Sequence, residues 1–482
     1  MNSLLLTLPT ELRLALNEMA RRWPGVWLVG GAVRDLLLGR ACADLDLTVA
    51  ESAETFAEVL RGQLGEGTLV RLGDSGEDTI RLVWRGFVVD VASLRGGAQN
   101  IEDDLFLRDY TIGAIALPLA SALGPASEDL TGTIIDPLDG QLDLQNRVLR
   151  ACPNAFTADP LRMLRGYRLA AQLGLTMTGE TREEISANAA GITTVAAERI
   201  CHELDLLLDQ PCGGEQFPVM WDDGLLPRLL PELMAGDGVE QPGFHHLDVL
   251  RHNLQALLQV EKLLSGQLHP APLPEAVAAL AEAPRRRRLL KYAALLHDVG
   301  KPEVQGIKNG RATFYGHDVT GGDMVPGIAA RLRWSAQDTK QVAALTALHM
   351  RPFHLCNARK AGKLTDKALL RLCREAGDML PELFLLAMAD SLASHGRLKP
   401  PDMENQVAEL YRLVATIYEE RFRPTQAAPR LVTGHDLIEV FGLQPGPDFA
   451  KLLREIEDAR LEGRIKSREE ALAFIAEKMK ND

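Results

Sequence analysis

Two kinds of hydrophobic pattern divide the chain near residue 150. From Trp27 to about Arg95, short apolar runs such as VWLVG, IRLVWR and FVVDVAS alternate with glycine and charged residues. Runs of this length bounded by turn residues predict strands, and the helical segment DLLLG lies among them. After Arg150 the apolar residues recur at helical spacing, as in AAERICHELDLLLD and DVLRHNLQALLQVEKLL. The pattern therefore predicts an α+β fold, with a mixed sheet and helices in the head and a mostly helical remainder.

Loop-like breaks rich in Pro, Gly or Ala subdivide the helical part. They lie at residues 210–216, 237–243, 266–274 and 424–429. We expect a head over residues 1–150, a helical neck and body over 151–240, a helical domain over 241–400 and a small helical tail over 401–482.

Composition and charge narrow the function classes. The 482 residues suffice for about three domains, and 53 basic against 66 acidic residues give a net charge of −13. Such a chain does not coat nucleic acid by bulk attraction, so a polyanionic partner needs a local basic surface. The six cysteines form no close pair, which argues against a zinc ribbon or a disulfide framework. No apolar run approaches the ~18 residues of a membrane span, and we expect a cytoplasmic protein with no membrane partner.

A glycine pair stands between the first predicted strand and the following helix. In LVGGAVRDLLLG, Gly30 and Gly31 leave backbone N–H groups and a helix N-terminus facing an anion, and Arg34 can bind phosphate oxygens. A glycine pair by itself is a weak signal. The segment predicts a phosphate site only in combination with the carboxylates of the next strand.

Two aspartates lie in that strand, DLDL. The period of two in a strand places Asp44 and Asp46 on one face. Two such charges repel each other unless cations lie between them, and a pair of Mg²⁺ ions is the usual solution. Asp90, in FVVDVAS, is a candidate third catalytic carboxylate. The cluster suits in-line displacement of pyrophosphate from a nucleotide. The alternative is that DLDL is a half-exposed edge strand.

Five ordered motifs over the first 210 residues resemble those of the class II tRNA nucleotidyltransferase and poly(A) polymerase family. They are LVGGAVRDLLLGR with DLDL, RDYTIGAIA, DPLDGQLDLQNRVLR, DPLRMLRGYRLAAQLG and ERICHEL. The resemblance implies a polymerase-beta-like nucleotidyltransferase head in which Asp44 and Asp46 bind Mg²⁺. It also implies that Arg108 and Asp109 lie near the sugar and triphosphate of a nucleotide.

By the same resemblance, Asp159 and Arg162 read the incoming base. Cytosine and adenine place an amino donor beside a ring-nitrogen acceptor, whereas uracil and guanine place a carbonyl beside a ring N–H. An Asp that accepts and an Arg that donates therefore suit the first two bases. The alternative is that Asp159 only caps the next helix and that Arg162 is solvated. A local positive surface for triphosphate and the RNA end is predicted from Arg147, Arg150, Arg162, Arg165 and Arg168.

Some positions depart from the family pattern. The motif usually written Arg-Arg-Asp-Phe-Thr-Ile-Asn-Ala here begins with Leu107 and has Gly113 in place of Asn, and Ala158 replaces an acid. The stretch between Arg95 and Arg108 is short where members that add all three terminal nucleotides carry a longer loop. We therefore expect tRNA, CTP and also ATP as partners, with the short loop favouring CC addition. A poly(A) polymerase, or a silent RNA-binding head serving a second active site, remains an alternative.

The helical part holds a second set of candidate metal ligands. Imidazoles and carboxylates from several helices, without thiolates, are typical of a transition-metal or Mg²⁺ site rather than structural zinc. In AALLHDVG, burying two adjacent ionisable residues would be costly without a metal. A lone buried histidine is more often an ordinary core residue, but here several occur together. The set is His252, His297, Asp298, His317, His349 and Asp390.

This order of residues resembles an HD-superfamily phosphohydrolase domain over residues 242–400. The resemblance implies that His317 and His349 bind a second metal and that the other four ligands bind the first. It also implies that Lys301 meets a phosphate group. The expected substrate is a phosphomonoester or a 2′,3′-cyclic phosphodiester at an RNA end. The identity of the metal and the oligomeric state stay open.

Overall fold

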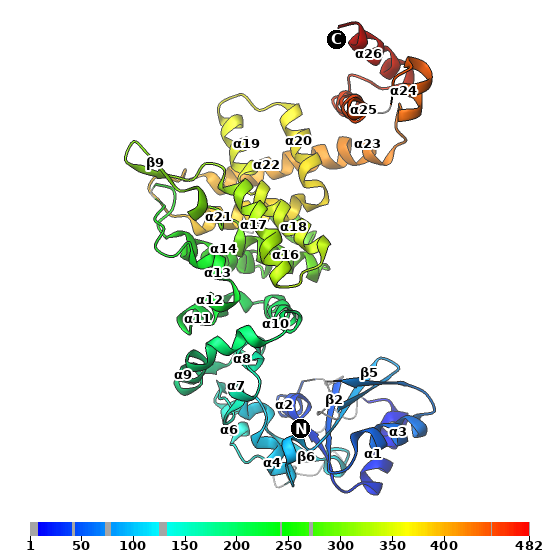
Figure 1. Ribbon diagram of the computed structural model, residues 1–482, viewed down its shortest axis with the longest axis vertical. Helices are drawn as coiled ribbons and strands as arrows, with labels where there is room; N and C mark the ends of the chain where they lie inside the picture. The colour runs from blue at the N-terminus through cyan, green and yellow to red at the C-terminus, as the bar shows by residue number, and fades with distance from the viewer. Residues whose placement is uncertain are drawn as a thin grey trace. The chain divides into compact units, whose positions relative to one another are not determined.

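The computed structural model describes residues 8–40, 44–72, 79–124, 133–241, 243–268, 273–444 and 446–481. Two compact units make up the chain, Met1–Leu229 and Leu230–Asp482 (Figure 1). In the part of the chain that is described, no helix has the length and apolar character needed to cross a bilayer.

The first unit contains the predicted mixed sheet, which has six strands in the order β3-β4-β5-β2-β1-β6. Strands β2 and β5 pair in parallel, and the other neighbours are antiparallel. The expected α+β head is therefore confirmed. The strands are β1 (Val26–Val29), β2 (Asp44–Val49), β3 (Thr68–Leu72), β4 (Thr79–Trp84), β5 (Phe87–Ser93) and β6 (Ala116–Pro118).

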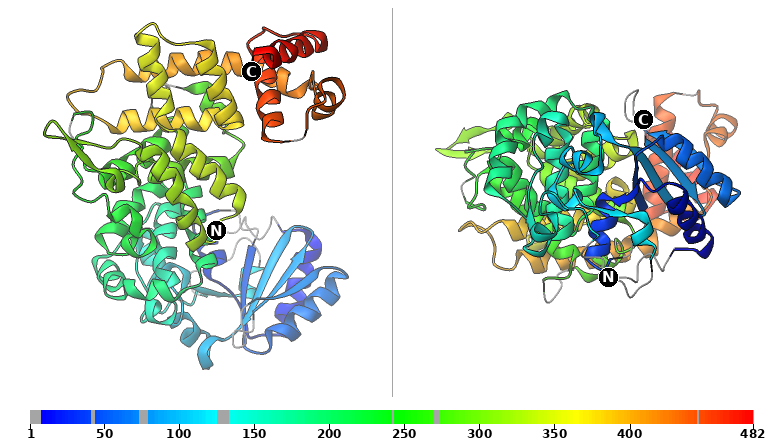
Figure 2. Two further views of the ribbon diagram at one scale, coloured as in Figure 1. Left: turned by 45° about the horizontal axis from the view of Figure 1, so that its top comes forward. Right: turned by 90° about the horizontal axis from the view of Figure 1, so that it is seen from below.

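Helices cover one face of this sheet, as Figures 1 and 2 show for α1 (Thr10–Arg22) and α3 (Ala53–Leu64). Leu45 and Leu47 of β2 are almost fully buried in the core beneath them. Because side chains alternate along a strand, Asp44 and Asp46 project from the opposite face. The fold therefore leaves the carboxylates on the uncovered side of the sheet.

The rest of the first unit is mostly helical, as predicted. Short helices α2 (Gly30–Leu37), α4 (Ile101–Phe106), α5 (Leu119–Ala122), α6 (Gly140–Gln145) and α7 (Ala155–Ala158) lead to α8 (Leu161–Leu173), α9 (Gly179–Asn188), α10 (Ala197–Asp209), α11 (Gln216–Asp222) and α12 (Leu226–Leu229). Helix α8 packs against α10. Strands β7 (Val148–Leu149) and β8 (Thr176–Met177) form a small parallel pair.

The second unit is built from helices around α21 (Leu380–Ala393), which is almost entirely buried. Helix α14 (Val249–Leu264) packs against α21 and α16 (Pro284–Leu296), and α17 (His317–Arg331) packs against α18 (Ala336–Leu348). A hairpin of β9 (Gly306–Lys308) and β10 (Arg311–Thr313) precedes α17. The remaining helices are α13 (Pro231–Met234), α15 (Pro274–Ala278), α19 (Arg351–Lys360), α20 (Asp366–Ala376), α22 (Met403–Ile417), α23 (Arg423–Ala427), α24 (Gly434–Phe441), α25 (Pro447–Leu461) and α26 (Arg468–Asn481).

One predicted break is wrong. Most of residues 424–429 belongs to α23, which follows α22 through a π-helical turn, Tyr418–Phe422 (Figure 1). Proline is tolerated in the first turn of a helix because its missing N–H has no partner there. Pro424 occupies such a position in α23, so the proline did not mark a loop.

Candidate functional site

A cavity of about 480 Å³ in the first unit brings together most of the predicted nucleotide-binding residues. Asp44 is exposed and lies outside its lining. The predicted residues that line the cavity are Gly30, Gly31, Arg34, Asp46, Asp90, Arg108, Asp109, Asp159, Arg162, Arg165 and Arg168.

The glycine pair allows the backbone to lie close to charged side chains. Gly30 begins α2 with φ +64°, and a Cβ there would stand 3.1 Å from a nitrogen of Arg108. A Cβ on Gly31 would stand 3.5 Å from Asp46 Oδ2. A larger residue at these positions would fill the space between the helix N-terminus and the carboxylate. The turn therefore fits the predicted phosphate site.

Asp46 and Asp90 face each other across the parallel strands β2 and β5. Burial raises the pKa of Asp46, and the charge of Asp90 raises it further, while Arg108 lowers it. A divalent cation would relieve this repulsion, so the carboxylates fit the predicted Mg²⁺ site. The pKa of Arg81 is raised chiefly by its hydrogen bond to Asp90, and the negative charge of Asp44 raises it further.

Arg81, on β4, changes the assignment of Asp90. Its guanidinium donates two hydrogen bonds of 2.8 Å to the two oxygens of Asp90. Both oxygens are therefore engaged by a cation that the sequence reasoning missed. The role of Asp90 as a third catalytic carboxylate stays a prediction.

Arginines dominate the cavity wall, with seven arginines against four aspartates. Burial lowers the pKa of Arg108 to about 10, and its guanidinium donates to Asp104 at 2.9 Å and to the Thr48 hydroxyl at 3.1 Å. Burial by itself would raise the pKa of Asp109. The positive charges of Arg165, whose Nε lies 3.1 Å from the carboxylate, and of Arg162 outweigh burial, so the pKa of Asp109 is lowered.

Not all of the predicted positive surface lies in this cavity. Arg147 and Arg150 are outside the lining, and Arg150 instead contacts Asp143 and Glu180. Arg95 and Arg199 line the cavity but were not predicted to bind nucleotide. Arg199 lies in the ERICHEL motif, which is the signal that could have found it.

Asp159 makes the capping contact of one sequence interpretation, while the base-reading interpretation stays a prediction. Its Oδ1 accepts the Leu161 N–H at 3.1 Å, which caps α8, and its Oδ2 lies 2.7 Å from a nitrogen of Arg199. Arg162 donates to the Arg108 carbonyl at 3.2 Å. Both members of the predicted base-reading pair therefore line the cavity in fixed positions.

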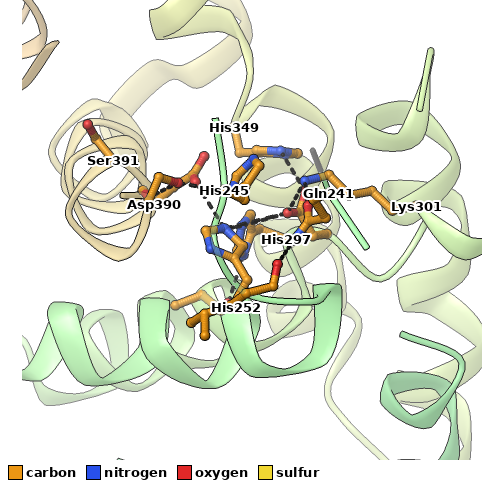
Figure 3. Close-up of polar contacts among 12 residues, drawn as sticks. Gln241, His245, His252, His297, Lys301, His349, Asp390 and Ser391 are labelled. Atoms are coloured by element: carbon orange, nitrogen blue, oxygen red, sulfur yellow. Dashed lines mark hydrogen bonds and ion pairs between the residues drawn. The ribbon is translucent and has the colours of Figure 1, made fainter. Parts of the chain in front are cut away.

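The six candidate ligands of the second unit also converge, and Figure 3 shows His252, His297, His349 and Asp390 among them. They come from α14, the end of α16, the start of α17, the end of α18 and α21. His252 Nε2 lies 3.1 Å from Asp390 Oδ1 and 3.2 Å from His297 Nε2. A second imidazole pair, His317 and His349, has its Nε2 atoms 3.3 Å apart.

The orientation of the imidazoles suits metal binding. His297, His317 and His349 each place Nδ1 2.7–2.8 Å from the backbone carbonyl three residues earlier. A ring that donates from Nδ1 leaves a lone pair on Nε2, and the Nε2 atoms point into the cluster. Burial lowers the pKa of His252 and of His349, which favours the neutral, ligating form.

Asp298 lies between the two histidine pairs. Its Oδ2 is 3.3 Å from His297 Nε2, and its Oδ1 is 3.2 Å from His317 Nε2. Among the described residues Oδ1 has no hydrogen-bond partner, although it is buried. A carboxylate between two groups of imidazoles fits a pair of divalent metal ions. The chemistry of the donors favours a transition metal or Mg²⁺ without deciding between them.

Three further residues contact this cluster. Lys301, predicted to meet phosphate, is buried with its Nζ 2.5 Å from Asp298 Oδ2, and it also contacts Gln241. Burial by itself would raise the pKa of Asp298. The effects of Lys301 and His297 are larger, so the pKa of Asp298 lies below its ordinary value. The ring of His245 packs edge-on against His252, with centroids 4.4 Å apart. Sequence reasoning missed Gln241 and His245.

Four family models match successive parts of the chain. The Poly A polymerase head domain matches residues 26–150, and a model described as a probable RNA and SrmB-binding site of polymerase A matches residues 174–236. The HD domain matches residues 273–394. The tRNA nucleotidyltransferase domain 2 matches residues 423–476.

Relatives align with almost the whole chain. An A-adding tRNA nucleotidyltransferase of Deinococcus radiodurans is 33% identical over 94% of this chain and 95% of its own. A CC-adding tRNA nucleotidyltransferase of Thermus thermophilus is 33% identical over 93% of this chain and 92% of its own. A multifunctional CCA protein of Pseudomonas fluorescens is 32% identical over 71% of this chain and 78% of its own.

Solved structures share the fold. The apo form I of a CCA-adding enzyme matches with a TM-score of 0.64 and 18% identity, covering 96% of this chain and 93% of that one. The Thermotoga maritima CCA-adding enzyme complexed with tRNA matches with a TM-score of 0.61 and 19% identity, covering 98% of this chain and 97% of that one.

Proposed function

The chain belongs to the tRNA nucleotidyltransferase family, and we propose from this premise that it adds nucleotides to the 3′ end of tRNA without a template. The observation that supports the proposal best is the first cavity. Asp46, the glycine turn at Gly30 and the pair Asp159 and Arg162 all line it. A carboxylate, a phosphate site and a base-reading pair thus share one space large enough for a nucleotide.

Each group has a separate part in the transfer. The N–H groups after Gly30, together with Arg34 and Arg108, bind the triphosphate and hold its phosphorus in line with the attacking hydroxyl. Mg²⁺ held by Asp44 and Asp46 would activate that hydroxyl and neutralise the leaving pyrophosphate. The arginines along the wall position the RNA end through its phosphates.

The Asp159 carboxylate and the Arg162 guanidinium select the base. Asp159 accepts from the exocyclic amino group of cytosine or adenine, and Arg162 donates to the neighbouring ring nitrogen. Uracil and guanine present a carbonyl and a ring N–H instead, which mismatch this pair. We therefore propose CTP and ATP as the nucleotides that fit.

The number of nucleotides added is a separate question. The segment after β5 is compact, because Arg95 N–H donates to Asp104 at 2.9 Å and α4 begins at Ile101. The segment between Arg95 and Arg108 therefore forms no long loop. The absence of the longer loop carried by members that add all three nucleotides supports CC addition. The Deinococcus relative is named A-adding, so transfer of a single AMP is the second candidate.

One experiment separates these products. Purified protein is incubated with tRNA transcripts that lack zero to three terminal nucleotides, each NTP is supplied separately, and the products are sequenced. Two CMP additions to the shortest tRNA, without AMP addition, are expected. AMP addition to tRNA ending in CC, without CMP addition to the shorter transcripts, would identify A-adding activity. Both additions would identify complete CCA addition, and long AMP tracts would identify a poly(A) polymerase.

We further propose that the His–Asp cluster hydrolyses a phosphomonoester or a cyclic phosphodiester. Its donor set fits two divalent metal ions, which would supply the nucleophile and bind the phosphate when present. His297→Ala is expected to abolish phosphate release and to leave nucleotidyl transfer intact, and Asp46→Ala should do the reverse. If Asp46→Ala changed neither activity, the first unit would be an RNA-binding module. A cytoplasmic location, where tRNA is the substrate, completes the proposal.

A further inference from the structure

A β-hairpin of the second unit has no part in the proposed nucleotidyl transfer. Its strands, β9 and β10, are joined by the two-residue turn Asn309-Gly310, in which both residues have positive φ, 53° and 71°. A type I′ turn requires this backbone, and an Asn-Gly pair adopts it readily. Figure 1 shows the hairpin at β9, where it projects from the helices of this unit. Its tip is therefore a regular element with defined faces.

The base of the hairpin is fixed against the His–Asp cluster. The Phe314 carbonyl lies 2.7 Å from Nδ1 of His317, the first residue of α17. The ring of Phe314 lies beside Lys301, whose Nζ is 5.8 Å from the ring centroid and also contacts Asp298. A tip on a fixed base loses little conformational freedom when it binds a partner, which favours binding.

Two cations oppose each other across the tip. Lys308 and Arg311 are directly paired in the register of β9 and β10, and both are exposed. Like charges in this arrangement repel each other and destabilise a hairpin. Neither has a carboxylate partner among the described residues, whereas Arg286 and Arg331 of the same unit are each paired with a glutamate. An anion between Lys308 and Arg311 would relieve the repulsion.

An exposed aromatic ring lies beside these cations. Tyr315 is 73% exposed, and Lys308 Nζ lies 5.8 Å from its ring centroid. Ile307 points to the opposite face of β9, because side chains alternate along a strand. Between Glu303 and Asp318 the sequence has no acidic residue. Cations beside an exposed ring suit an RNA chain, because its phosphates contact the cations and an unpaired base stacks on the ring.

We propose that this hairpin binds an unpaired stretch of RNA, with Lys308 and Arg311 on backbone phosphates and one base stacked on Tyr315. The protein has a net charge of −13, so RNA requires local positive surfaces of this kind. An anionic membrane fits less well, because its recognition takes clusters of about 4–8 cations. The inference goes beyond the cavity of the first unit and gives the second unit an RNA contact of its own.

The salt dependence of binding tests the two cations. Full-length protein is titrated into a fluorescently labelled tRNA transcript without nucleotide, so that the result does not depend on catalysis. Replacing both cations, Lys308→Gln with Arg311→Gln, is expected to lower the slope of log Kd against log salt concentration by about 1.4, since each phosphate contact with a single strand contributes about 0.7. Lys363→Gln with Lys367→Gln removes the same charge from another exposed surface of this unit and is the matched control. An equal change in both double variants would reflect bulk attraction and overturn the assignment.

Substitution of the ring tests the stacking contact. Tyr315→Ala is expected to raise Kd for the same tRNA about tenfold, the effect of one lost base stack, whereas Tyr315→Phe should keep the wild-type Kd because the ring remains. Ile307→Ala, on the opposite face of the hairpin, should also leave Kd unchanged. An unchanged Kd in Tyr315→Ala would overturn the stacking contact.

Two further measurements separate RNA binding from other roles of the hairpin. If the cations serve RNA rather than the fold, the variant that lacks both should melt no lower than the wild type, because a repulsion has been removed. A lower melting temperature would indicate a structural role instead. Loss of self-association in sedimentation, with Kd for tRNA unchanged, would assign the hairpin to an interface with a second copy and overturn the proposal.

Discussion

Asp46 is the residue on which the proposed nucleotidyl transfer would depend most directly. Its carboxylate lies within the cavity, opposite Asp90, and its pKa is raised by burial and by that neighbouring charge. A bound cation and a bound proton therefore compete for the same oxygens. Asp44, on the same strand face, is exposed and has more access to water.

We predict that Asp46→Asn lowers kcat by roughly 10²–10³ or more, as for other losses of charge stabilisation. As the pH is lowered, the activity of the wild type should fall because protonation of Asp46 displaces the cation. Since the pKa of Asp46 is raised, this fall should begin at a higher pH than it would with an ordinary aspartate. Raising the Mg²⁺ concentration should move this fall to lower pH. A pH–rate profile at two Mg²⁺ concentrations checks it, and coinciding profiles would contradict the role of Asp46.

We propose Arg199 as a positioning residue for base selection. It holds Asp159 Oδ2 while the Leu161 N–H holds Oδ1, so the carboxylate has one orientation. We predict that Arg199→Ala lowers the preference for CTP over UTP about tenfold, since one base contact is worth about 1–3 kcal/mol. Competition between the two nucleotides measures it. Arg150→Ala, outside the cavity, serves as control; equal loss of preference in both variants would indicate a general structural effect.

Helix α8, which carries the predicted base-reading Arg162, makes a close contact with Tyr110 of the head. The Tyr110 hydroxyl donates to the Arg162 carbonyl at 2.8 Å, and Gly166 lies beside that hydroxyl. A Cβ on Gly166 would stand 2.0 Å from the Tyr110 oxygen, and both residues are buried. The position of Arg162 thus depends on a glycine one turn further along α8.

Gly166→Ala is accordingly expected to destabilise the first unit by about 1–3 kcal/mol, the usual cost of overpacking a core. Gly62→Ala is the matched control, because it is an exposed glycine in α3 with no atom within 4 Å of an added Cβ. That change should stabilise the unit by about 0.5–1 kcal/mol, since alanine loses less conformational freedom. Urea unfolding of both variants measures the difference, and equal stabilities would show that Tyr110 moves aside freely.

Elements with strong periodicity were the ones that the sequence could predict. The strands around DLDL and FVVDVAS, and helices such as α14 and α21, follow from their hydrophobic spacing. The continuation of α22 into α23 could not be predicted in this way, because a proline in the first turn of a helix looks like a loop signal in the sequence. Arg81 was missed since it reaches Asp90 only through the register of β4 on β5, which no local pattern encodes.

At the scale of the whole chain, two units hold two sites of opposite character. The first has an excess of arginines and receives a polyanion, whereas the second has buried imidazoles. Motif order indicated both sets of candidate ligands, because each type of chemistry requires particular side chains, and the structure brings the second set together. The supporting residues Gln241 and His245 were not predictable, because the folding of the second unit alone places them beside the ligands.

This separation predicts how metal affects stability. Asp298 Oδ1 and His252 Nδ1 are buried without hydrogen-bond partners among the described residues, and an ion would compensate Asp298. Binding to the folded state stabilises by about 2.7 kcal/mol at a ligand concentration of about 100 times Kd. Chelation with EDTA should therefore lower the melting temperature of the second unit in calorimetry, independently of its effect on the Mg²⁺ site proposed for the first unit. His252→Ala should lose this response and Asp46→Ala should keep it, because Asp46 belongs to the other unit. An unchanged transition of the second unit would show that the cluster holds no structural metal.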